Sequence, residues 1–220
     1  MSLSKTAIPQ AALDDLPLFP LPQVVLFPHA MLPLHVFEPR YRALLKDCLN
    51  THKSMAMALI VDPDDKDEHG NPRIARVAGV GVIVEHQELP DGRSNVLLHG
   101  TGRVTLVELP FVPPYRRARA SVLVDVDAPI GPEERTALIA TANAFTSDVH
   151  QRDAGFSFRL PENLESSTLA DLCAHHLVID ANERQRILEE ADPRERVRRV
   201  TLELARQHGQ LHRERGGFLN

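Results

Sequence analysis

Residues 16–49 constrain the fold of this chain more than any other stretch. Their sequence, LPLFPLPQVVLFPHAMLPLHVFEPRYRALLKDCL, places prolines at positions 17, 20, 22, 28 and 33 between short apolar runs. Because proline has no backbone N–H and a fixed φ, this segment cannot form one long helix or strand. We therefore expect short strands at sheet edges or bends, wrapped tightly around a small barrel.

A helix is predicted where this proline-rich stretch ends. Pro39 presets φ for a first helical turn. The residues that follow recur at the three- and four-residue spacing of one helical face. The predicted buried face consists of Tyr41, Leu44, Leu45, Cys48 and Leu49.

Residues 76–109 predict a β-hairpin. Two β-rich runs, VAGVGVIVEHQEL and NVLLHGTGRVTLVEL, are joined by Pro90-Asp91-Gly92-Arg93, and Asp-Gly is a strong hairpin signal. Glycines at positions 79, 81, 100 and 102 predict bulges or bends that curl the sheet. A further strand is predicted over residues 116–126.

The composition changes at residues 128–132, APIGP, and the pattern beyond them is helical. Three pairs predict capping boxes at helix starts: Thr168 with Asp171, Asp180 with Glu183, and Asp192 with Glu195. We predict an α+β chain with a flexible leader (1–13), a β-rich subdomain (14–128) and a helical subdomain with a frayed C-terminus (129–220).

Charge and hydropathy exclude several classes of protein. The net charge of −5 gives no general attraction to nucleic acid or anionic membranes. No run reaches the roughly 18 apolar residues of a membrane span, and the N-terminus lacks the apolar core of a signal peptide. Cys48 and Cys173 each fall within a predicted helix, which indicates reduced thiols rather than a disulfide framework. We expect a cytoplasmic protein with no membrane partner.

The sequence contains no complete catalytic or cofactor motif. A phosphate-binding P-loop is excluded because no lysine follows Lys66, and Ser157 lacks the second glycine of a nucleophile elbow. We therefore predict no catalytic residues, no cofactor and no enzymatic activity.

Histidine pairs raise the question of a metal site. His208 and His212 share a helical face at four-residue spacing, as do Cys48 and His52. No third ligand of the kind found in H-E-x-x-H motifs is close in the sequence, so we predict no metal.

Three blocks of sequence resemble, in order, the N-terminal substrate-binding domain of ATP-dependent Lon proteases. They are LPLFPLPQVVLFPHAMLPLHVFEPRYRALL, LPDGRSNVLLHGTGRVTLVEL and STLADLCAHHLVIDANERQRILEEADPRERVRRVTLEL. Gly100 and Arg103 fall on the Gly-x-x-Arg of that family, and the likeness covers residues 16–207. The resemblance implies a PUA-like β pseudo-barrel followed by a C-terminal α-helical bundle.

For function, the resemblance implies recognition of protein substrates. In Lon this region engages unfolded or tagged substrates and carries neither ATPase nor protease residues. Because the chain ends at Asn220, we expect a stand-alone, non-enzymatic peptide-binding module, with an adaptor role in proteolysis or protein quality control. The expected partners are unfolded or exposed apolar polypeptide segments and, through the adaptor role, a protease complex.

Residues of the proline-rich stretch are the candidate peptide contacts. They are Phe27, Pro28, Met31, Leu32 and Phe37. Apolar side chains of this kind usually pack inside a core, and this alternative is stronger for Phe37 than for the others.

An RNA-binding module is the alternative function, because PUA-like barrels also serve RNA recognition. Its candidate contacts are Tyr115, Arg116, Arg117 and Arg119, of which Arg117 and Arg119 share one strand face. A second basic run, residues 194–199, is interleaved with glutamate and is typical of a solvated helix face. The overall negative charge makes nucleic acid the weaker expectation.

Overall fold

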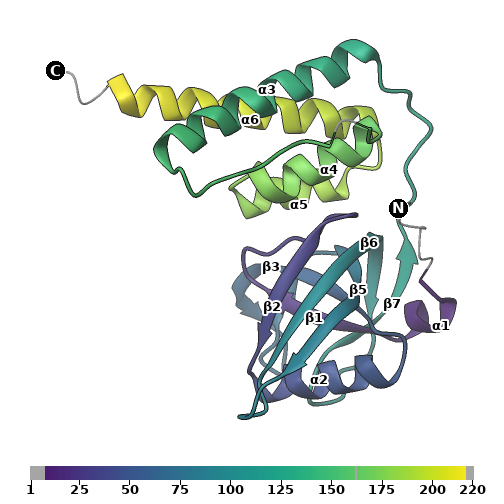
Figure 1. Cartoon of the computed structure of the whole chain (residues 1–220). Coiled ribbons are helices and arrows are strands. Elements are labelled where there is room, and N and C mark those ends of the chain that lie inside the picture. Colours follow the sequence, from purple (N-terminus) through teal and green to yellow (C-terminus); the bar gives the residue numbers. More distant parts are fainter. Residues whose placement is uncertain (1–7, 162, 217–220) are drawn as a thin grey trace. The chain divides into compact units, whose positions relative to one another are not determined.

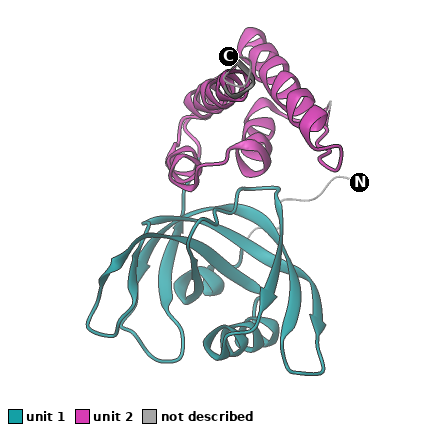
Figure 2. Cartoon of the chain, turned by 90° about the vertical axis from the view of Figure 1, so that its left-hand side faces the viewer, with its two compact units in different colours: residues 1–124 teal, residues 125–220 magenta. Residues whose placement is uncertain are grey.

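The structure, a computed structural model, describes residues 8–161 and 163–216. Contacts within the chain divide it into two compact units, residues 1–124 and 125–220 (Figure 2). The elements of the first unit are α1 (Gln10–Asp14), β1 (Leu16–Leu21), β2 (Met31–Val36), α2 (Pro39–Asn50), β3 (Ser54–Lys66), β4 (Pro72–Ile74), β5 (Val77–Glu88), β6 (Ser94–Glu108) and β7 (Arg117–Val122). Those of the second are α3 (Pro132–Arg152), α4 (Ser166–Leu177), α5 (Ala181–Glu189) and α6 (Pro193–Gly216).

The strands of the first unit close into a ring (Figure 1). The pairing runs from β1 through β7, β6 and β5 to β3. A parallel pairing of β3 with β1, with Leu18 beside Ala56, completes the ring, and the other pairings are antiparallel. β2 pairs with β6 and β4 pairs with β3. The predicted α+β class, a β pseudo-barrel followed by helices, is confirmed.

Alternate residues of these strands fill the barrel, as the two-residue period of a strand requires. β1 contributes Leu16 and Leu18, and β3 contributes Ala56 and Ala58, all at most 1% exposed. Small side chains on β3 leave room for the leucines of β1 and for the valines of β5 and β6.

Two glycines let the chain after β1 lie directly against the barrel wall. A Cβ on Gly79 would lie 1.8 Å from the carbonyl oxygen of Leu26, and one on Gly100 would lie 2.0 Å from that of Phe27. No side chain fits in that space, because a carbon and an oxygen that are not bonded cannot approach so closely. These two glycines, which the sequence predicted as bulges or bends, are thus required for a close backbone approach; the register of β5 and β6 shifts between the pairs Val80–Gly102 and Gly81–Gly100.

Helix α2 covers β1. Four residues of its predicted buried face are buried in the structure: Tyr41, Leu44, Leu45 and Cys48. The Tyr41 ring stacks on Phe19 with centroids 4.0 Å apart, and its hydroxyl donates to the Pro20 carbonyl over 3.0 Å. Pro39 occupies the first turn as predicted. One aromatic side chain thus fixes the helix to the proline-rich strand by both packing and a hydrogen bond.

The flexible leader predicted over residues 1–13 differs from the structure at its C-terminal end. Residues 1–7 lie outside the described residues, but Gln10–Asp14 form α1. Ala12 and Leu13 are buried, and Leu13 packs into the barrel core. Burial of these two apolar side chains holds this segment against the barrel.

In the second unit, α3 and α6 pack side by side and run parallel (Figure 1). Glu134 near the start of α3 pairs with Arg194 near the start of α6, and Asp148 further along α3 contacts His208 further along α6. Parallel neighbours need a crossover, and α4 and α5 supply it. None of the described helices is long and apolar enough to cross a bilayer.

In two of the three predicted capping boxes the aspartate caps its helix, and the third prediction is wrong. Oδ1 of Asp180 accepts from the Glu183 N–H over 2.7 Å, and Oδ1 of Asp192 accepts from the Glu195 N–H over 3.3 Å. α4 instead begins at Ser166, so Asp171 lies inside this helix and is buried. Asp171 instead forms an ion pair with the buried Arg196 of α6.

Candidate functional site

β2 is an edge strand, since among the described residues it pairs with β6 alone. The Gly100 N–H donates to the Ala30 carbonyl over 2.8 Å, so Ala30 occupies a hydrogen-bonded position. Such positions alternate along an antiparallel ladder. Met31, Pro33 and His35 therefore direct their backbone groups away from β6, toward the open edge.

This open edge carries an incomplete set of hydrogen-bonding groups. Met31 and His35 each offer an N–H and a carbonyl, whereas Pro33 offers a carbonyl only. Proline is tolerated in a sheet where its nitrogen faces outward from an edge, and here it also limits uncontrolled strand pairing. A visiting strand of about five residues would still find two donors and three acceptors.

Three of the candidate contact residues are accessible on or beside this edge. Met31 is 39% exposed and Phe37, directly after β2, is 59% exposed, while Leu32 is half-buried. The alternative that Phe37 packs in the core does not hold, since most of this residue is exposed, and Phe37 remains a candidate contact. It stands at the point where the chain leaves β2 and turns into α2.

The other two candidates precede β2 in the chain. Phe27 is fully buried, whereas Pro28 is half-buried, as Leu32 is. The Phe27 backbone is held against Gly100, so its side chain enters the core. The prediction of Phe27 as a contact residue is therefore wrong, because a partner could reach it only after local unfolding.

A groove of about 580 Å³ lies between α2 and the β5–β6 hairpin. It begins where β2 ends, because Ser94 in its wall pairs with Val36 of β2, and Pro39 in its wall opens α2. Arg42 and Lys46 line it from α2. Sequence reasoning missed the groove, since these residues form the polar face of an amphipathic helix and nothing local indicates the hairpin opposite.

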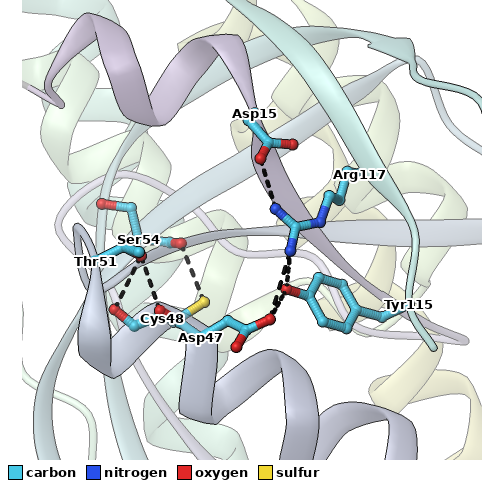
Figure 3. Close-up of polar contacts among 7 residues, drawn as sticks. All are labelled: Asp15, Asp47, Cys48, Thr51, Ser54, Tyr115 and Arg117. Carbon is cyan, nitrogen blue, oxygen red and sulfur yellow. Dashed lines mark hydrogen bonds and ion pairs between the residues drawn. The ribbon is translucent and has the colours of Figure 1, made fainter. Parts of the chain in front are cut away.

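The RNA candidates Tyr115 and Arg117 form a closed cluster with two carboxylates (Figure 3). The Tyr115 hydroxyl donates to Oδ2 of Asp47 over 2.5 Å, and the Arg117 guanidinium donates to Oδ2 of Asp15 over 2.5 Å. Arg117 also contacts Oδ2 of Asp47 at 3.4 Å, donates to the Tyr115 hydroxyl and lies 4.8 Å from that ring's centroid. Burial, followed by the hydrogen bond to Asp47, raises the pKa of Tyr115.

The remaining members of that basic cluster do not complete a phosphate-binding surface. Arg116 makes two hydrogen bonds to the Glu108 carboxylate, at 2.8 and 2.7 Å, and one to the Pro72 carbonyl at 2.7 Å. Arg119 is exposed. Three carboxylates thus neutralise Arg116 and Arg117, and Tyr115 is buried, so this surface does not favour RNA.

The two thiols are not activated nucleophiles. Cys48 and Cys173 are fully buried. Burial raises the pKa of each to about 12, and neighbouring Asp47 adds to this effect at Cys48. Both side chains therefore stay protonated and unreactive at neutral pH.

Comparison with protein families gives one match that spans most of the chain. The model of the family described as the ATP-dependent protease La (LON) substrate-binding domain matches residues 15–206. Among curated proteins, a Lon protease from Dictyoglomus thermophilum is 28% identical over 206 residues, and one from Roseiflexus castenholzii is 30% identical over 203. Each alignment covers 88% of this chain and 24% of the relative, so the chain spans about a quarter of the relatives' length.

Solved structures give the same fold. A Lon N-terminal domain protein from Xanthomonas campestris is 26% identical with a TM-score of 0.61, covering 84% of this chain and 96% of that one. The N-terminal domain of a Mycobacterium avium complex Lon protease has a TM-score of 0.64 at 15% identity, covering 88% and 99% of the two chains. The second likeness concerns the fold alone.

Proposed function

The chain belongs to the family of Lon substrate-binding domains, and from this premise we propose that it binds extended polypeptide segments along the open edge of β2. One observation carries the proposal: the edge of β2 that pairs with no other described strand has an exposed apolar residue at each end, Met31 and Phe37. Folded domains usually cover or blunt such an edge, because an open strand edge invites pairing with another chain.

The binding mode is strand addition. An extended client segment would accept hydrogen bonds from the N–H groups of Met31 and His35 and donate to the edge carbonyls. Such main-chain contacts are independent of client sequence. The missing donor at Pro33 weakens the pairing, which suits a module that must also release its clients.

Residues at the two ends of the β2 edge would determine which client side chains are preferred. Met31 offers a flexible apolar side chain that adapts to different partners, and Phe37 offers an aromatic face. Beyond Phe37 the groove presents Arg42 and Lys46, against the carboxylate of Glu88. We expect apolar segments flanked by an acidic residue to bind more tightly than those flanked by a basic one.

We further propose that this role is binding without catalysis. The titratable groups that line the groove are Arg42, Lys46, His86 and Glu88, and both thiols are buried elsewhere. A module of this kind would act as an adaptor that passes clients to a protease complex. The support for this step is the family itself, whose curated members matched here are Lon proteases.

A panel of fluorescent extended peptides, apolar with acidic or basic flanks, tests the proposal by anisotropy. Saturable binding is expected, and Met31→Asp and Phe37→Asp should each weaken it at least tenfold. Val107→Asp is the matched control, because Val107 is 66% exposed on β6 but is not on the β2 edge. If no peptide of the panel binds saturably, the proposed function is wrong. If all three variants retain binding, only the proposed site is wrong.

The backbone mode has its own test. Pro33→Ala adds a donor to the open edge and should tighten binding by about three- to tenfold, the worth of one hydrogen bond. Peptides N-methylated at alternate amides should lose affinity in one phase of the alternation and keep it in the other. Equal affinity for both methylated series would rule out strand addition.

A further inference from the structure

We propose that Asp148, His208 and His212 form a binding site for a divalent transition-metal ion on the helical unit. The three side chains come from two packed helices, Asp148 from α3 and the two histidines from α6. The four-residue spacing places both imidazoles on one face of α6. The parallel packing of α3 then brings in the third ligand, which lies 60 residues away from His208 in the sequence.

The three ligand atoms converge on one point. Oδ2 of Asp148 lies 3.0 Å from Nε2 of His208 and 2.9 Å from Nε2 of His212, and the two Nε2 atoms are 3.1 Å apart. The same carboxylate oxygen and the same ring nitrogens thus make all three contacts. A metal site requires this convergence of single atoms, whereas a chain of hydrogen bonds does not.

Protons on the two neutral imidazoles cannot satisfy the three contacts together. If both Nε2 atoms carry hydrogen, both donate to Asp148, but two donors then face each other across 3.1 Å. If His208 instead donates to His212, the lone pair of His212 faces a carboxylate lone pair at 2.9 Å. A cation removes the conflict, because all three atoms then direct a lone pair toward it.

The triangle has the right size for such an ion. With sides near 3.0 Å its corners lie about 1.7 Å from its centre, so an ion about 1.1 Å above the plane is about 2.0–2.1 Å from each atom, the distance found for zinc ligands. Little rearrangement of either helix is needed to reach this geometry.

The ligand set selects the class of metal. Two imidazoles and one carboxylate suit Zn²⁺ and its neighbours Co²⁺ and Ni²⁺, whereas Ca²⁺ and Mg²⁺ prefer oxygen ligands throughout. The His212 side chain is 52% exposed and that of Asp148 is 16% exposed, so the site opens to solvent on one side. Water can complete a tetrahedral shell there. The ion would join α3 to α6 at the far end from the Glu134–Arg194 pair.

Calorimetric titration of the full chain, free of any histidine tag and cleared of metal with a chelator, tests this site with ZnCl₂. We expect one equivalent to bind, and Co²⁺ to give the visible absorption of a tetrahedral complex. Asp148→Asn, His208→Gln and His212→Gln should each weaken binding more than tenfold. His150→Gln, on the same helix α3 but bonded to the Phe156 carbonyl, should leave affinity unchanged.

Circular dichroism of the metal-free proteins separates loss of ligands from loss of fold. The proposal is overturned if the wild-type chain takes up no stoichiometric Zn²⁺, which would make the cluster a hydrogen-bonded contact only. It is also overturned if a folded His208→Gln/His212→Gln variant binds as tightly as the wild type, since the ion would then lie elsewhere.

Discussion

The Tyr115 hydroxyl lies 2.5 Å from Oδ2 of Asp47 and thereby joins the loop before β7 to helix α2. Tyr115 is buried, and Tyr115→Phe removes its hydrogen bond to the Asp47 carboxylate, whose side chain is 52% exposed. We expect the free energy of unfolding to fall by about 1–2 kcal/mol. Urea unfolding at neutral pH measures it. Exposed Arg119→Ala on β7 is the control, expected within about 0.5 kcal/mol of wild type, and equal midpoints for both variants would contradict the role of this bond.

Tyr41 and Tyr115 are the two tyrosines of the chain, which has no tryptophan. Burial raises the pKa of both phenols above the ordinary value of 10.0. Each phenol therefore contributes stability that is fully present below pH 10 and is lost as pH rises through its higher value in the folded chain. Phenolate absorbance should stay absent at pH 10 in the native protein and appear near pH 10 in urea. A native phenol that ionises at or below pH 10 would refute this.

Gly100 and Gly102 differ in what a side chain would meet, although both lie in β6. A Cβ at Gly100 would be 2.0 Å from a backbone oxygen, whereas one at Gly102 would be 3.8 Å from Cγ1 of Val80. Gly100→Ala should therefore cost about 3 kcal/mol or more, since backbone must move. Gly102→Ala should be near neutral. Thermal unfolding of the two variants compares them directly, and similar melting temperatures would argue against the close approach.

Local signals in the sequence predicted much of this fold. The Asp-Gly pair predicted the β5–β6 turn, where Gly92 has φ of 78° and the Leu89 N–H donates to the Arg93 carbonyl. The three- and four-residue spacing predicted the buried face of α2. Features of this kind depend on residues close in sequence, and turn geometry and helical period determine them.

Features that depend on distant residues could not be predicted in this way. Phe27 and Phe37 each follow an aliphatic residue in the proline-rich stretch, yet one is buried against Gly100 and the other is exposed. Asp148 lies 60 residues from His208, so the third ligand was missed. The basic run on α6 was interpreted as solvated throughout, but packing of α4 buries Arg196 within it.

Arg196 is the next test, because its side chain is 1% exposed and holds two carboxylates. It donates twice to Asp125, at 2.8 and 2.9 Å, and its Nε donates to buried Asp171 at 3.1 Å. Arg196→Leu leaves a buried carboxylate without this cation and should cost about 3–5 kcal/mol. Arg198→Leu, which breaks an exposed pair with Glu195, should cost at most about 1 kcal/mol.

A double variant checks the cause of that loss. Arg196→Leu/Asp171→Leu removes the buried carboxylate together with its partner, so part of the stability should return relative to Arg196→Leu alone. If the second substitution instead lowers the free energy of unfolding further, as an independent change in the core would, then lost packing rather than an unpaired charge explains the effect of Arg196→Leu.

Phe27 and Phe37 separate the core from the contact surface in a single pair of substitutions. Phe27→Ala empties a fully buried site and should cost about 3–5 kcal/mol. Phe37→Ala should change stability by less than about 0.5 kcal/mol, because 59% of this residue is exposed. Urea unfolding and peptide anisotropy on the same samples should rank the two variants oppositely. Phe27→Ala should lose stability but keep its peptide affinity at temperatures where it stays folded, whereas Phe37→Ala should keep its stability and lose peptide affinity. The reverse pattern would place the binding surface inside the barrel wall, where only local opening could expose it.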